Sequence, residues 1–177
     1  MIWLLACAAH QPMEGAAVRG YERELAAWTR EERRYNGVET VLLVRATLDS
    51  PEWVRLREEQ RAWLLQSPAD SRGEAEQKAV EEAEAEWKFT LAVTTDRDRR
   101  PTLSTDTPPW LVRLTVGDQP CTLTAMRERE PTEMDIALYP WVSPWLNLWE
   151  LSFARDCGQG SPKLQIVGPT AAAALVW

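Results

Sequence analysis

The sequence predicts a mainly β protein, an antiparallel β-sandwich into which a pair of helices is inserted. Three observations predict it. Short stretches of alternating apolar and polar residues dominate the second half of the chain. Gly, Pro or Asp residues separate these stretches at short intervals, which is typical of antiparallel sheets. Between residues 51 and 87, by contrast, apolar residues recur at helical spacing.

Length and composition predict one ordinary globular domain. The chain has 177 residues, of which 45% are hydrophobic and 27% are charged. Its net charge of -7 and pI near 4.9 oppose a large cationic surface, so we expect no nucleic-acid partner. No run of about 18 apolar residues occurs, so we expect no membrane-spanning helix.

The first residues of the chain carry a candidate lipid attachment site. Leu4-Leu5-Ala6-Cys7 resembles the lipobox of bacterial lipoproteins, in which a small residue precedes a cysteine that is acylated. The resemblance implies a truncated signal-like segment over residues 1–6, a lipidated tether over residues 7–20 and a domain over residues 21–177. Only six residues and no basic residue precede Cys7, which departs from the family pattern. The alternative is a short buried strand over residues 2–6.

The domain begins with a segment that suits two kinds of structure. Tyr21, Leu25 and Trp28 recur at helical spacing, and the charges of residues 29–34 also suit an edge strand. Asn36-Gly37 is a turn or stop signal. The β-branched residues of 38–48 then predict a central strand.

Two helices are expected over residues 51–87. Ser50-Pro51-Glu52 is a helix start, and the first helix should run to about Gln66. Ser71 and Glu74 have the spacing of a capping box for the second helix, which should continue to Trp87. Ten acidic and five basic residues in this part contribute -5 of the net charge of -7, which predicts a solvated helix face. The expected apolar stripe of the first helix is Trp53, Leu56, Trp63 and Leu64.

The rest of the chain predicts short strands. The clearest are 87–93 and 110–116, in which apolar residues alternate with polar ones. Others are expected at 121–126, 134–139, 148–154, 163–167 and 172–177. In number and spacing these strands resemble an immunoglobulin-like β-sandwich over about 90 residues. Strand 38–48 should join it, which makes the helical pair an insertion.

Enzyme chemistry finds little support in the sequence. The lone histidine, His10, lies in the expected tether, so a His-dependent catalytic site or a zinc site is not expected. Asp96 and Asp98 are flanked by arginines, which opposes a calcium site. No glycine-rich loop for a nucleotide occurs. We therefore expect no enzyme, no metal and no cofactor, although paired carboxylates stay open as an alternative.

Two cysteines remain after Cys7. Cys121 and Cys157 form an even number in a chain that export would place in an oxidising compartment, so we expect one disulfide between them. The alternative is two separate buried thiols.

Ten tryptophans are many for a chain of this length. Trp141, Trp145 and Trp149 fall close together, and the Ser143-Pro144 helix start could place Trp145 and Trp149 on one side. If these three rings are exposed, they would form a platform for a ligand. If they are buried, they would fill the core.

These observations lead to an expected function. The chain resembles uncharacterised lipoproteins of Gram-negative envelopes, which implies a membrane partner through the lipid anchor and, because Ala8 follows Cys7, an outer-membrane location. Its domain would be a binding or structural module for an unidentified protein or glycan. The alternatives are a soluble extracytoplasmic hydrolase that uses paired carboxylates and a cytosolic α+β protein without export.

Overall fold

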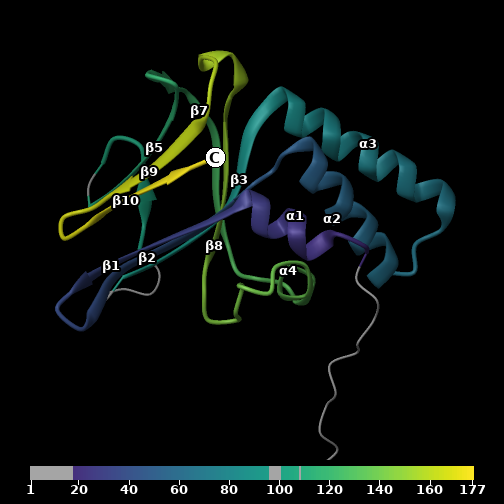
Figure 1. The fold of residues 1–177 in the computed structure, drawn as a ribbon, viewed down its shortest axis with the longest axis horizontal. Coiled ribbons are helices and arrows are strands. Elements are labelled where there is room, and N and C mark those ends of the chain that lie inside the picture. The colour runs from purple at the N-terminus through teal and green to yellow at the C-terminus, as the bar shows by residue number, and fades with distance from the viewer. Residues whose placement is uncertain (1–17, 96–100, 108) are drawn as a thin grey trace, which may run out of the picture.

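Two sheets and a layer of helices make up the computed structural model, which describes residues 18–95, 101–107 and 109–177 (Figure 1). The first sheet has the order β1-β2-β3-β8-β7 and the second the order β10-β9-β5-β4, with β6 paired to β5. All strand pairs are antiparallel except β4 with β5.

Most strands lie close to where the sequence predicts them, whereas the two-residue strand at Leu103–Ser104 was not expected. Those of the first sheet are β1 (Thr29–Asn36), β2 (Glu39–Leu48), β3 (Glu86–Thr95), β7 (Leu123–Arg129) and β8 (Leu148–Ala154). Those of the second are β4 (Leu103–Ser104), β5 (Trp110–Val116), β6 (Gln119–Cys121), β9 (Pro162–Val167) and β10 (Ala172–Val176). A mainly β sandwich is therefore confirmed, whereas its immunoglobulin-like type stays a prediction.

The main core lies between the two sheets. On β5, Val112 and Leu114 point inward and Arg113 between them is exposed, as the period of two requires. On the core face of the first sheet, Phe89 of β3 contacts Phe153 of the neighbouring strand β8 edge to face, with 6.1 Å between ring centroids. Buried apolar residues of the second sheet, such as Leu164 and Ile166, belong to the same continuous cluster.

Helices cover the other face of the first sheet (Figure 1). They are α1 (Tyr21–Trp28), α2 (Pro51–Leu64), α3 (Ala69–Ala85) and α4 (Glu133–Leu138), and a 3-10 turn, η1, spans Arg155–Cys157. A second core forms there around Trp53, which is fully buried between the rings of Tyr21 and Tyr139. None of the described helices has the length and apolar character needed to cross a membrane.

The inserted helices differ in detail from the prediction. Helix α2 starts as expected, with the Ser50 hydroxyl accepting the Trp53 N–H, but Trp63 of the predicted stripe is 41% exposed. Val54 and Ala62 are buried instead. Val54 belongs to the second core, and α2 packs against both α1 and α3. The predicted capping box of α3 is wrong. That helix begins two residues before Ser71, whose hydroxyl donates to the Pro68 carbonyl.

One other expectation is corrected. Residues 134–139 were expected to form a strand, but they belong mostly to α4, because Thr132 and Asp135 form a capping box that starts a helix. At the start of the described residues the chain already contacts the domain. The Val18 N–H donates to the Gln60 side chain at 2.8 Å, and Val18 packs on the second core.

The segment at the start of the domain contains both a helix and an edge strand, the two structures that its sequence suits. Residues 21–28 form α1, and the charged residues that follow form β1, an edge strand paired with β2. The Asn36-Gly37 turn joins the two strands, and Gly37 has a φ of 63°, which favours glycine. Helices α2 and α3 stand between β2 and β3, which are neighbours in the first sheet, so they are an insertion.

Candidate functional site

The three tryptophans of the predicted platform do not come together. Trp149 lies on β8 and is buried in the core between the sheets. Trp145 is 74% exposed, in a segment of turns where Ser143-Pro144 starts no helix. Trp141 is half-buried beside the ring of Tyr139, with 5.6 Å between centroids. No shared face is left on which these three rings could bind one ligand.

A different set of tryptophans lines one cavity. Trp28, Trp87 and Trp177 surround a cavity of about 440 Å³ where the start of α2 meets the segment between β8 and β9. We call this cavity the tryptophan pocket. Its other lining residues are Leu48, Asp49, Ser50, Pro51, Glu52, Arg155, Gly160, Ser161 and Pro162.

Backbone hydrogen bonds position two of these rings. Trp28 ends α1, and its carbonyl accepts the indole N–H of Trp177 at 2.6 Å. Trp177 follows β10, and its backbone N–H donates to the Pro162 carbonyl. The Trp177 ring also contacts Phe89, with 5.2 Å between centroids. Trp28 and Trp177 both pack against the main core, so this part of the pocket wall is continuous with it.

The third ring, Trp87, has an arginine on its face. Trp87 lies near the start of β3, and the guanidinium carbon of Arg155 is 3.5 Å from its ring centroid. Arg155 also donates to the Ala83 carbonyl at 3.2 Å. Burial lowers the pKa of Arg155, so its guanidinium is partly desolvated there. The indole N–H of Trp87 is buried and has no hydrogen-bond partner among the described residues.

The pocket also has an acidic side. Asp49 exposes only 8% of its surface, and its Oδ2 atom accepts a hydrogen bond from Arg57 at 2.7 Å. Burial opposes the charge of Arg57, yet Asp49 and other neighbours raise its pKa well above the usual value. The other carboxylate oxygen, Oδ1 of Asp49, is buried and lacks a partner in the described part of the chain. Two residues that line this pocket thus each carry a buried polar atom without a hydrogen-bond partner among the described residues.

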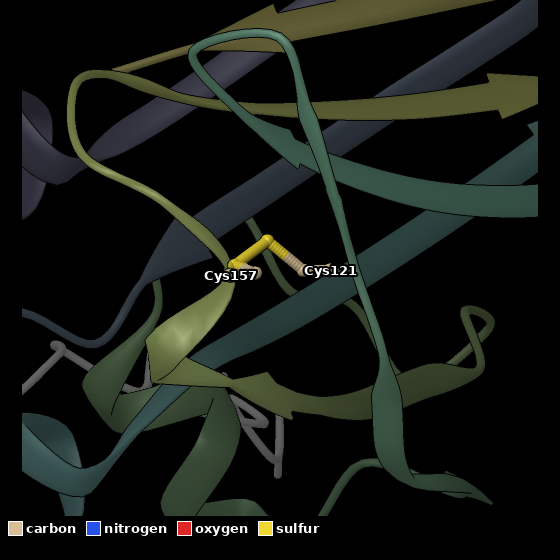
Figure 2. The surroundings of a disulfide bond; sticks show 2 residues. All are labelled: Cys121 and Cys157. Atoms are coloured by element: carbon tan, nitrogen blue, oxygen red, sulfur yellow. A yellow bond between two sulfur atoms is a disulfide. The ribbon is translucent and has the colours of Figure 1, made fainter.

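A disulfide bond holds the wall that carries Arg155. It joins Cys121 of β6 to Cys157 of η1, two residues after Arg155, with 4.9 Å between the Cα atoms (Figure 2). This separation meets the requirement of about 4.4 to 6.8 Å for a bridge. Beside it the backbone packs closely, because a Cβ atom on Gly158 would lie 2.8 Å from the Val116 carbonyl oxygen. The segment after η1 is therefore held against the β5–β6 turn.

A second cavity, of about 500 Å³, lies between α2, α4 and the first sheet and is lined by charged residues. Its charges are largely paired: Arg129 binds Asp135 at 2.6 Å, and Lys88 binds Glu82 at 2.7 Å. Hydrogen bonding from Lys88 lowers the pKa of Glu82. Burial would raise the pKa of Asp135, but hydrogen bonds from Arg129 and Thr132 lower it. Neither carboxyl group has the raised pKa that a general acid needs near neutral pH.

Several candidates from the sequence cannot be placed. Cys7, His10, Asp96 and Asp98 lie outside the described residues. Within the ranges that are described, no three His, Cys, Asp or Glu side chains gather to hold a metal ion.

The sequence gives no local signal for the tryptophan pocket. Its rings come from α1, β3 and the residue after β10, so no spacing along the chain relates them. The three tryptophans share one property: each lies at or near the end of a helix or strand, and such residues lie at the end of a sandwich.

Fold and site together define a β-sandwich protein with one helical layer and a tryptophan-lined pocket at its end. No known protein family matches the chain, and no curated protein or solved structure is significantly similar to it.

Proposed function

We propose that this chain is a lipid-anchored protein of the bacterial envelope whose domain binds a small ligand in the tryptophan pocket. The observation that carries the binding role is the pocket itself: three indole rings surround it, and a buried donor on Trp87 and a buried acceptor on Asp49 lack partners. Ligand pockets combine apolar walls with a few polar groups in this way, and about 440 Å³ lies within their usual range of about 300 to 1,000 Å³.

The envelope location rests on two further observations. Leu4 to Cys7 resembles a lipobox, and Ala8 after Cys7 favours the outer membrane. The disulfide between Cys121 and Cys157 suits an oxidising compartment such as the periplasm. Several acyl chains on one cysteine would hold the domain at a membrane surface without a spanning helix.

Lipid attachment is tested by expression in a Gram-negative host behind a complete signal sequence. Mass spectrometry of the N-terminal peptide should show an acylated Cys7, and a sucrose gradient should place the protein with the outer membrane. The Cys7→Ala variant is the control and should leave the membrane fraction. Wild-type protein that keeps an unmodified Met1 and stays soluble would overturn the anchor.

Ligand binding is tested separately, on the domain without its lipid. The melting temperature of the protein is measured against a panel of sugars, amino acids, nucleosides and quaternary amines. At least one compound should raise it in the wild type and in Trp145→Phe, which changes an exposed ring outside the pocket, and not in Trp177→Phe. If no compound stabilises the folded wild type, or if Trp177→Phe responds like the wild type, the binding role is wrong.

A further inference from the structure

We propose that the ligand of the tryptophan pocket is a neutral saccharide ring, which takes the place of the Arg155 guanidinium over Trp87. This inference rests on the proposed binding function and names the chemical class that the pocket accepts. Three properties of the pocket lead to it: the aromatic walls, the unpaired polar atoms and the arrangement of charge.

The walls suit a ring that is apolar on its faces and polar at its edge. Indole rings from Trp28, Trp87 and Trp177 line the pocket on separate elements. Each is half-buried, so part of its surface is still accessible. Aromatic faces stack on the C–H face of a sugar, and the sugar hydroxyls then point outward from the stack toward polar neighbours.

The unpaired atoms suit hydroxyl groups. The indole N–H of Trp87 needs an acceptor, and Oδ1 of Asp49 needs a donor. A hydroxyl group both donates and accepts, so saccharide hydroxyl groups can pair with either atom once that atom is exposed. A purely apolar ligand would leave both of them unpaired.

The charges disfavour ionic ligands of either sign. Asp49 and Glu52 line the pocket and would repel an anion. The guanidinium groups of Arg155 and Arg30 lie near Trp87 and Trp177, at 3.5 and 5.9 Å from the ring centroids, and their positive charge would repel a cation. A neutral ligand avoids both forms of repulsion.

Arg155 must move for this ligand to reach Trp87. The indole nitrogen of Trp87 has less than 1 Å² accessible to solvent, and the guanidinium covers the ring at 3.5 Å. Arg155 is held by its contact with the Trp87 ring and by a hydrogen bond of 3.2 Å to the Ala83 carbonyl, and its partly desolvated charge regains hydration when the side chain moves into water. The side chain is therefore an exchangeable cover, and the ligand competes with it for one aromatic face.

The experiment is a titration of the folded protein labelled with 5-fluorotryptophan, followed by fluorine NMR and calorimetry. The probes are glucose, galactose and N-acetylglucosamine as neutral sugars, with choline and glucose 6-phosphate as charged ones. A neutral sugar should bind and shift the Trp87 resonance, which is assigned from its loss in Trp87→Phe. Trp87→Phe should weaken binding at least tenfold, and Trp145→Phe, the matched control, should not change it.

The Arg155→Ala variant tests the exchange. It removes the competitor and should bind the same sugar several-fold more tightly; weaker binding would mean that Arg155 is a ligand contact and would overturn the exchange. Should Trp87→Phe fail to fold, Trp177→Phe takes its place with the same expected loss. Binding of choline or the sugar phosphate, with no binding of neutral sugars, would overturn the saccharide class and leave the proposed binding function standing. Sugar binding that neither tryptophan variant weakens would overturn this site.

Discussion

The carboxylate of Glu32 accepts a hydrogen bond from the backbone N–H of Ala174, so a side chain on the edge strand of one sheet binds the edge strand of the other. Two arginines of the same strand also bind β10. Arg30 donates to the Val176 carbonyl and Arg34 donates to the Ala172 carbonyl, each at 2.9 Å. Alternate side chains of β1 thus satisfy the outer backbone groups of β10. This arrangement covers an edge that would otherwise be open to pairing with another chain.

Glu32→Ala should therefore weaken the fold and expose this edge. We expect a loss of about 1 kcal/mol in the free energy of unfolding, since one backbone hydrogen bond is lost, measured by urea denaturation. Light scattering should show association that grows with concentration. Glu39→Ala, on the exposed start of β2, is the control and should change neither property. A Glu32→Ala protein that stays monomeric and fully stable would show that β10 needs no cover.

Breaking the disulfide should destabilise the domain. The bridge between Cys121 and Cys157 closes a loop of 36 positions. The chain-entropy estimate for such a loop is about 3 to 4 kcal/mol. Cys157→Ser and the reduced wild type should unfold at similar, lower temperatures in calorimetry, and reductant should not affect the variant further. Equal melting of oxidised and reduced wild type would contradict a stabilising bridge.

Asp135 should give the domain a dependence on acidic pH. Its folded pKa is lowered, so the stabilisation is present above the unfolded value near 3.8 and is lost as the pH falls through the folded value. Asp135→Asn should lose about 2 to 3 kcal/mol at neutral pH, because charged hydrogen bonds to Arg129 and Thr132 are weakened. The free energy of unfolding of Asp135→Asn should also change less between pH 5 and about pH 2 than that of the wild type, measured by urea denaturation at each pH. Parallel pH curves for the two proteins would count against this assignment.

The two inserted helices should differ in local stability. Helix α2 buries Trp53, Val54, Gln60 and Ala62, whereas Ala83 is the buried residue of α3 among those whose side chains are described. Few buried contacts make local opening easy. Hydrogen exchange followed by mass spectrometry should be faster in α3 than in α2 and in β5. Uniform protection across both helices would mean that the insertion opens as one unit.

Much of the fold follows from local patterns. Strand β5 was predicted at its observed bounds, because its apolar residues alternate and each sheet buries one face toward the other. The start of α2 was predicted from Ser50-Pro51, and the structure shows the Ser50 cap. The prediction of a strand over residues 134–139 was wrong. It rested on Met134, Ile136 and Leu138, which alternate with polar or small residues as in a strand. The Thr132 and Asp135 capping box was the better signal, and a segment of six residues is too short for periodicity to outweigh it.

By itself the sequence indicated most of the strands and the place of the helical insertion, because both depend on local periodicity and on turn residues. Its even number of domain cysteines favoured one disulfide. The tertiary structure alone decided which tryptophans share a pocket. Trp28, Trp87 and Trp177 meet because β10 returns to lie beside β1 and because β2 and β3 carry the helices to the same end of the sandwich. Strand register and helix docking set these contacts, and both depend on burial of surfaces far apart in the chain, which no local pattern records.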